Sequence, residues 1–351
     1  MFTPFGSDLL THVVLWTSLT VTAVVIAIVC WITTLRLQGK FIGTHESRFL
    51  RTWRPLLLEA VDAVPRQLPR VGKRDWFVFL ALWNQFHDSL RGPARHRLNA
   101  VALQLRMDSA ARNLLSTRDT ENQLVAVMTL GHLGDQDSWS ILESVARSRT
   151  PILSLAALRA LFQTNPSRAM AILLSSIGAR DDWPVKQLER ILSEADSTAV
   201  SEGLIQAAEI AIPSELPRLI ALMNAAHPAA AEPYLLRLTR SSQDEEVLIA
   251  CLKSRHAPKH LDAITPFMSH TSWQVRAQIA RLLGDAMLPG DEHLLISLLS
   301  DKVWWVRYRA GQSLAQLQFL SQGELWQLRD TVTDAFAQDI LDQVVAEKKM
   351  T

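Results

Sequence analysis

The sequence has little of what metal-binding, disulfide-rich or nucleic-acid-binding proteins display. Its 351 residues include two cysteines, Cys30 and Cys251, which lie far apart and suggest neither a disulfide framework nor a metal cluster. Lys and Arg number 36 and Asp and Glu number 35, so the formal net charge is +1. A near-neutral chain gives no sequence-wide reason to expect nucleic acid as a partner, and we expect none.

The motifs of common enzyme classes are also missing. There is no G-x-x-x-x-G-K-[ST] phosphate loop, no G-x-G-x-x-G fingerprint, no G-x-S-x-G elbow and no H-E-x-x-H zinc motif. His256 and His260 stand four residues apart, but Pro258 lies between them and no nearby acid or cysteine completes a metal set. We therefore expect no enzymatic activity, no cofactor and no metal site.

One long stretch lacks charge altogether. Between Asp8 and Arg36 there are 27 residues without an Asp, Glu, Lys or Arg. About 20 apolar residues in a helix cross the hydrocarbon core of a bilayer. No basic region precedes the stretch and no small-x-small site follows it, which argues against a cleaved signal peptide. We predict a transmembrane helix over 9–35 after a short extracytoplasmic tail, 1–8; a buried core helix is the alternative.

The charges after this stretch predict its orientation. Among the residues that follow it, Glu46 is the only acid beside five basic residues: Arg36, Lys40, Arg48, Arg51 and Arg54. The positive-inside rule then places the C-terminal side in the cytoplasm. Together with an Arg-, Ala- and Leu-rich composition typical of GC-rich bacterial genomes, this predicts a single-pass protein of the bacterial inner membrane with its N-terminus outside. The basic juxtamembrane segment, 36–75, either contacts anionic lipid or acts only as a topology signal.

From about residue 119 the chain shows no sustained strand-like alternation and repeats a helical phrase instead. Residues 272–285 read SWQVRAQIARLLGD and residues 303–317 read VWWVRYRAGQSLAQL, so Trp, a spacer, Val and Arg recur 31 residues apart. Apolar or small residues follow the valine at offsets that keep one helix face. From Val306 these are Ala310, Ser313, Leu314 and Leu317. Similar stripes begin near 122, 153, 184, 215, 246 and 275.

Further short amphipathic helices fit between these stripes. Two short helices in one unit cannot bury their apolar faces alone, but stacked units share a continuous core. The W-x-V-[RK] start, the small residue four positions after the valine and the closing LGD resemble HEAT repeats, especially the short bilin-lyase type. The resemblance covers roughly 119–320.

The predicted fold class is all-α: an N-terminal transmembrane helix followed by a HEAT-like α-solenoid, a superhelix of helix pairs. After the segments named above, we assign divergent leading helices, HEAT-like repeats, a C-terminal capping helix and a tail to 76–118, 119–320, 321–345 and 346–351. The capping helix is expected because Ser321 to Glu324 has the spacing of a capping box.

The resemblance also implies roles for the basic residues of the phrase. In HEAT-like units the basic residue after the valine usually bonds to the neighbouring inter-repeat turn. Lys186, Arg276 and Arg307 are therefore predicted to form a structural ladder, with a ligand-binding row as the alternative. The tryptophans at 183, 273 and 304 are expected to cover repeat junctions.

Three other residues of the best-preserved phrase are the candidate protein-binding residues. Trp305 adjoins Trp304, and two adjacent helix residues cannot share one face. Tyr308 and Arg309 lie off the stripe that begins at Val306, and residues of these types dominate binding at many interfaces. The alternative is that all three pack against the C-terminal cap.

These observations predict a membrane-anchored scaffold or adaptor that binds a protein partner at the cytoplasmic face of the inner membrane. The partner would be a membrane protein or complex, such as an envelope polysaccharide or secretion assembly, by analogy of architecture. The alternative is a HEAT-like lyase or another enzyme with no recognisable motif. A bound cofactor or metal would favour that alternative.

Overall fold

The structure is a computed structural model that describes residues 45–257, 261–286, 290 and 292–348. All its regular elements are helices, and no strand occurs in these ranges, so the all-α prediction is confirmed. The predicted tail 1–8 and transmembrane helix 9–35 lie outside the described residues, as do Arg36 and Lys40. Within the described ranges, no helix has the length and apolar character needed to cross a membrane.

The chain divides into two compact units, Met1–Leu133 and Gly134–Thr351. The boundary falls after α5 (Thr120–Leu133), which the sequence pattern assigned to the first repeat. Within the first unit α5 packs against α2 (Trp76–Ser89) and α4 (Met107–Leu115). The helix that opens the repeat pattern therefore belongs with the leading helices.

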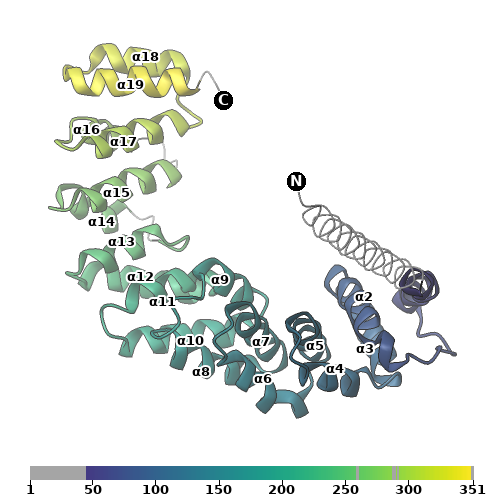
Figure 1. Ribbon diagram of the computed structural model, residues 1–351. Coiled ribbons are helices and arrows are strands. Elements are labelled where there is room, and N and C mark those ends of the chain that lie inside the picture. Colours follow the sequence, from purple (N-terminus) through teal and green to yellow (C-terminus); the bar gives the residue numbers. More distant parts are fainter. Residues whose placement is uncertain (1–44, 258–260, 287–289, 291, 349–351) are drawn as a thin grey trace, which may run out of the picture. The chain divides into compact units, whose positions relative to one another are not determined.

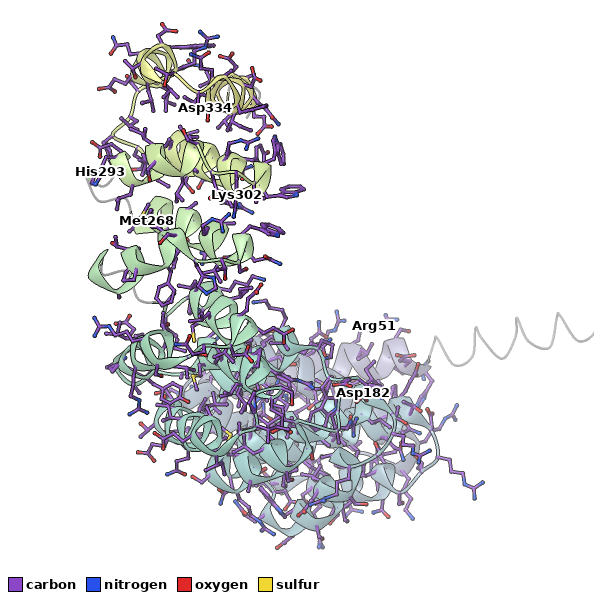
Figure 2. All side chains as sticks on the ribbon, turned by 90° about the vertical axis from the view of Figure 1, so that its left-hand side faces the viewer. Arg51, Asp182, Met268, His293, Lys302 and Asp334 are labelled. Carbon is purple, nitrogen blue, oxygen red and sulfur yellow. The ribbon has the colours of Figure 1, made fainter. Side chains whose placement is uncertain are left out.

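The described part of the first unit begins with a helix over 45–62, inside the predicted juxtamembrane segment. Trp53, Leu57 and Ala60 are buried at helical spacing, and the Trp53 ring meets Phe79 of α2 edge-on at 4.8 Å between centroids. Arg48, Arg51 and Arg54 are exposed on the same helix, and Figure 2 shows Arg51 on its outer side. The segment is thus a packed amphipathic helix as well as a basic flank.

The prediction of leading helices over 76–118 is matched by α2, α3 (Pro93–Gln104) and α4, preceded by a short 3-10 helix, Lys73–Asp75. These helices have a buried core, in which Phe79, Trp83 and Leu98 have no exposed surface. The indole Nε1 of Trp83 donates to the Leu98 carbonyl at 3.0 Å and joins α2 to α3.

The second unit consists of successive short helices separated by turns. In chain order they are η2 (Gln136–Ser138), α6 (Trp139–Ala146), α7 (Pro151–Thr164), α8 (Pro166–Ser176), α9 (Val185–Ser193), α10 (Ser197–Ile210), α11 (Leu216–Leu222), η3 (Met223–Ala225), α12 (Pro228–Ser241), α13 (Glu245–Lys253), α14 (Leu261–Ile264), η4 (Thr265–Ser269), α15 (Trp273–Ala286), α16 (Glu292–Leu299), α17 (Trp304–Gln316), α18 (Gln322–Thr331) and α19 (Ala335–Lys348).

These helices form two layers. The odd-numbered helices from α7 to α19 each pack against the next odd-numbered helix, and α8, α10, α12 and α14 do the same in the other layer. In Figure 1 the successive helix pairs from α12 to α19 lie stacked one on another. Such stacking is the architecture of an α-solenoid, in which each unit buries its apolar face against its neighbours.

The residues of the predicted stripe supply the shared core. Val275, Ile279, Val306, Ala310 and Leu314 have no exposed surface and belong to one cluster between α13 and α19. Small residues set how closely the odd-numbered helices approach. A Cβ on Gly284, in the LGD of α15, would lie 2.6 Å from the Ser313 Cβ of α17. Any larger residue would therefore force these helices apart.

The C-terminal cap is two helices rather than the single helix predicted over 321–345. The capping box of α18 is present, because the Ser321 side chain accepts from the Glu324 N–H and the Glu324 carboxylate accepts from the Ser321 N–H. The first helix ends at Thr331, and a new helix, α19, begins after Asp334. The Asp334 carboxylate accepts from the Phe336 N–H at 2.8 Å and so caps the start of α19. Apolar residues continue at helical spacing across this interruption, so the sequence pattern predicted one helix.

Candidate protein-binding surface

The basic residues of the repeated phrase meet in the turn between α16 and α17. Arg276 is 4% exposed, and its Nε and Nη2 atoms donate to the two carboxylate oxygens of Asp301 at 2.6 and 2.8 Å. Its Nη1 donates to the carbonyls of His270 and Thr271, in the turn before its own helix. One guanidinium thus ties two successive inter-repeat turns together, as the ladder interpretation requires.

The charges of this pair support each other. Hydrogen bonding to Asp301 raises the pKa of Arg276. Burial acts to raise the pKa of Asp301, but hydrogen bonds from Arg276 and the Val303 N–H more than offset it, so that pKa lies below its usual value. Both side chains therefore stay charged at neutral pH, and the pair acts as a structural clamp.

Arg307 continues the row from the next helix. Its Nη1 donates to the Asp301 carbonyl at 2.8 Å, and its guanidinium lies over the Phe336 ring of α19 at 5.0 Å. Arg276 and Arg307 therefore converge on one residue of the same turn.

Lys186 does not occupy the place predicted for it. Its side chain is 84% exposed and its Nζ pairs with Glu189 of its own helix at 2.9 Å. Arg180 and Arg218 make the junction contacts in this region instead. Arg180 donates to the Ser148 carbonyl at 2.9 Å, and Arg218 donates to the carbonyls of Ile177, Arg180 and Trp183.

The candidate binding residues Trp305, Tyr308 and Arg309 lie together at a groove of about 400 Å³, which we call the tryptophan groove. It spans α13, α15 and α17, and its other lining residues are Ile249, Lys253, Trp273, Gln274, Ala277 and Gln278. Trp273 is the first residue of α15 and Trp305 is the second residue of α17, and they are 37% and 57% exposed. Their rings expose apolar surface to solvent on two helices that stack on each other.

The aromatic rings beside the groove brace one another. Trp304 stacks on Tyr308 with 4.9 Å between centroids and a 9° angle, and it meets Trp305 edge-on at 4.7 Å. A ring held by its neighbours loses little conformational freedom when a ligand covers it. The arrangement therefore suits recognition of an apolar side chain.

The charge of the tryptophan groove has one sign. Lys253 and Arg309 line it, and no acidic residue in the described part of the chain does so. Among the described residues Lys253 makes no ion pair, and Arg309 donates only to the neutral Gln312, at 3.2 Å. The groove thus combines aromatic surface with two cations that are not neutralised within it.

Tyr308 lines the groove and also contacts the C-terminal cap. Its hydroxyl lies 3.1 and 3.3 Å from the two carboxylate oxygens of Glu347 in α19 and accepts from the Gln312 amide at 2.9 Å. Partial burial and the bond to Glu347 raise the pKa of Tyr308. The alternative of packing against the cap therefore applies to Tyr308, whereas in the described residues Trp305 and Arg309 make no hydrogen bond, ion pair or ring contact with α18 or α19.

The sequence did not identify the contribution of α13 to the groove. Ile249 and Lys253 come from α13, where the repeat pattern is poorly kept, and only the stacking of α13 on α15 brings them beside Trp273. Trp273 was expected to cover a repeat junction, but it is partly exposed at the groove. The sequence signal that could have identified Trp273 is that it occupies the same position of the repeated phrase as Trp304.

Metal-binding groups and the cysteine thiol are the next side chains to consider. No group of three or more His, Cys, Asp or Glu residues within the described ranges is placed to hold a metal ion. Cys251 is fully buried, and burial raises the pKa of its thiol to about 12, so it is not a nucleophile at neutral pH.

No known family model matches the chain, and a search of curated proteins finds no match. Among solved structures, the chain is similar to an engineered protein of a structural genomics consortium, at 16% identity over 82% of this chain and 87% of that chain, with a TM-score of 0.30. It is also similar to an archaeal HEAT-like repeats protein from Thermococcus onnurineus NA1, at 15% identity over 80% and 100% of the two chains, with a TM-score of 0.23. A second engineered protein shares 15% identity over 84% and 96% of the chains, with a TM-score of 0.16. Scores this low carry no argument about function, and the solenoid assignment rests on the stacked helix pairs themselves.

Proposed function

We propose that this protein is a non-catalytic scaffold that binds a protein partner through the tryptophan groove. The observation that carries the proposal is that one groove holds exposed indole rings from two neighbouring helices, α15 and α17, together with Lys253 and Arg309. No acid within the groove neutralises these two cations. Buried aromatic and arginine side chains supply most of the affinity at protein interfaces. By charge complementarity, the partner segment carries apolar side chains flanked by carboxylates.

The proposed setting is the cytoplasmic face of the bacterial inner membrane. It rests on the uncharged stretch over 9–35 and the basic residues that follow it, of which Arg48, Arg51 and Arg54 are exposed on one helix. An anchor of this kind raises the effective concentration of the solenoid toward other membrane proteins. We therefore propose a membrane protein or complex as the partner, such as an envelope polysaccharide or secretion assembly, and anionic lipid as a contact of the basic helix.

The test is recovery of partners from detergent-solubilised membranes with the full-length chain. A Trp305→Ala, Arg309→Ala double variant is compared with an Arg149→Ala, Ile152→Ala double variant, which removes a cation and a 61% exposed apolar side chain from another part of the solenoid. The proposal expects a specific set of proteins to be lost with the first variant and kept with the second. Equal recovery with both variants contradicts it.

Two further measurements test the remaining parts of the proposal. Reporter fusions after Arg54 and at Thr351 should be active only as cytoplasmic reporters, and periplasmic activity from either contradicts the topology. Purified full-length protein should retain no stoichiometric cofactor and turn over no substrate, since either result would point to the enzyme alternative.

A further inference from the structure

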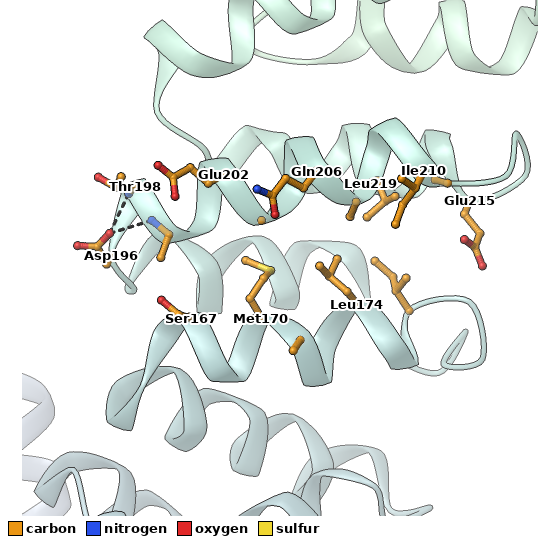
Figure 3. A pocket seen from close by; sticks show the side chains of 16 residues that line it. Ser167, Met170, Leu174, Asp196, Thr198, Glu202, Gln206, Ile210, Glu215 and Leu219 are labelled. Carbon is orange, nitrogen blue, oxygen red and sulfur yellow. Dashed lines mark hydrogen bonds between the residues drawn. The ribbon is translucent and has the colours of Figure 1, made fainter.

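A second and larger groove lies on the other layer of the second unit. It has a volume of about 720 Å³ and runs between α8 and α10, with Leu219 of α11 also in its lining. We call it the acidic groove. Figure 3 shows α8 contributing Ser167, Met170 and Leu174 from one side and α10 contributing Glu202 and Gln206 from the other.

Small residues on α10 give the groove its depth. Ala199, Gly203 and Ala207 line it at four-residue spacing, so they lie on one face of the helix. A Cβ on Gly203 would lie 2.5 Å from the Met170 Cγ. Met170 therefore crosses close to the α10 backbone and forms an apolar floor between the two helices.

Apolar surface extends from this floor to one end of the groove. Ile210, the last residue of α10 and part of the groove lining, is 87% exposed, and Ile212 just beyond it is 58% exposed. Exposed isoleucines that adjoin a groove form a continuous apolar surface, which is typical of an interaction site.

The charge of this groove is opposite to that of the tryptophan groove. Asp196, Glu202 and Glu215 line it, and no basic residue among those that the structure describes does so. Figure 3 shows Asp196 and Glu215 at its two ends. The arginine closest in sequence to Glu215 is Arg218, whose guanidinium donates to three carbonyls and to Asp181 rather than to an acid of the groove.

We propose that the acidic groove is a second docking site, and that it binds a basic amphipathic helix of a protein partner. The argument is one of shape and charge. A groove bounded by two neighbouring helices accepts the apolar ridge of a third helix, which is a recurrent mode of peptide recognition. The three carboxylates attract Lys or Arg side chains on the edges of that ridge, and they disfavour an acidic or anionic ligand.

The dimensions set the length of the occupant. α10 contains 14 residues, and at about 1.5 Å per residue it is about 20 Å long. The acids at the two ends of the groove are therefore matched by a helix of about four turns with basic residues in its first and last turns. This site is separate from the tryptophan groove, so either site can be correct without the other.

The test uses a synthetic 14-residue amphipathic peptide of Leu and Lys that carries one photoreactive benzoylphenylalanine on its apolar face. The full-length protein is titrated with this peptide and with a matched peptide in which every Lys is Glu. Crosslinked sites are then mapped by mass spectrometry. The proposal expects the basic peptide to crosslink within the groove, at Met170, Leu174 or Ile210, and expects the acidic peptide not to do so.

Three variants separate charge, shape and general electrostatics. Glu202→Lys reverses a charge on the exposed rim and should weaken binding of the basic peptide at least tenfold. Ala207→Phe should also weaken it by filling the groove. Asp339→Lys makes the same charge change on the exposed face of α19 and should leave it unaltered. Crosslinks outside the groove, equal labelling by both peptides, or equal affinity for the Glu202→Lys and Asp339→Lys variants would overturn the proposal.

Discussion

The tryptophan phrase occurs at 183 and again at 273 and 304, yet the structure uses it in two ways. Trp183 is 1% exposed, and its Nε1 donates to the Ser154 hydroxyl at 2.9 Å while Arg180 covers its ring at 4.4 Å. Trp273 and Trp304 are 37% and 40% exposed. The same residue type in the same phrase is a core residue in one region and a surface residue in the other.

The cause is a single proline. Pro184 follows Trp183, and a residue before proline is disfavoured in helical conformation, so α9 begins only at Val185. In α15 and α17 the tryptophan is itself the first helical residue. The delayed start leaves Trp183 in the turn, where it reaches the core. The buried stripe of α9, with Leu188, Ile191 and Leu192, then follows position 184 rather than the valine, and Lys186 is rotated into solvent.

The first way to test this comparison is to remove Trp183. Trp183→Ala should lower the free energy of unfolding by about 4 kcal/mol, because it empties a buried site and leaves the contacts of Arg180 and Ser154 without the ring. Urea denaturation followed by circular dichroism measures the loss. Trp304→Ala serves as the surface counterpart and should cost much less. Equal losses in the two variants would show that burial does not distinguish the two regions.

The second test addresses the basic residue of the phrase. Asp301→Asn removes the charge opposite Arg276 and keeps the shape, and it should cost about 2 kcal/mol because hydrogen bonds between buried charged groups contribute about 1.5–3 kcal/mol. Lys186→Gln breaks an exposed pair and should change stability by less than about 0.5 kcal/mol. If both variants melt together with the unaltered protein, the junction at Asp301 does not stabilise the stack.

These two regions also show how far the sequence could predict the fold. The stripe from Val306 predicted buried residues correctly at Ala310, Ser313, Leu314 and Leu317, because helical periodicity determines which side chains share a face. Between 213 and 269 the stripe is kept only in part: Leu219, Leu222 and Met223 are buried, but α14 has four residues and 3-10 turns interrupt the repeat at η3 and η4.

Only part of the binding surface could be predicted from the sequence. Trp305 and Arg309 could be selected because they lie off the apolar stripe of their own helix. Their neighbours Ile249 and Lys253 depend on how α13 stacks against α15, which periodicity within one helix does not determine. The acidic groove had no sequence signal at all, since it arises from the spacing of α8 and α10.

A buried histidine sharpens the contrast with Arg276. His87 of α2 is 4% exposed, its ring nitrogens make no hydrogen bond of standard geometry within the described residues, and its ring stacks on His132 at 4.1 Å. Burial, with the nearby His132 and Arg95, lowers the pKa of His87 to about 3, although Asp88 and Asn99 oppose this shift.

Stability should therefore fall on acidification. Below the ordinary histidine pKa of about 6.5 the unfolded chain binds a proton that native His87 does not, so stability present above that pH is lost as pH falls toward about 3. Between pH 7 and pH 5.5 the loss due to His87 should be about 1 kcal/mol. His87→Phe keeps a stacked ring and should reduce this pH dependence, as measured by urea denaturation at the two pH values. An unchanged slope would assign the acid sensitivity to other groups.

The smallest effect on stability is expected at the tryptophan groove, and it separates binding from packing. Trp305 is 57% exposed, so Trp305→Ala should lower the free energy of unfolding by less than about 1 kcal/mol, as is usual for surface substitutions. Tyr308→Phe removes the hydroxyl that meets Glu347 and should cost less than about 0.5 kcal/mol, because that contact is exposed. Partner recovery should nevertheless fall with Trp305→Ala and persist with Tyr308→Phe, since the exposed indole supplies contact area while the tyrosine hydroxyl is directed to the cap. If melting falls together with recovery in Trp305→Ala, the ring is a packing residue like Trp183, and the difference between the two regions disappears.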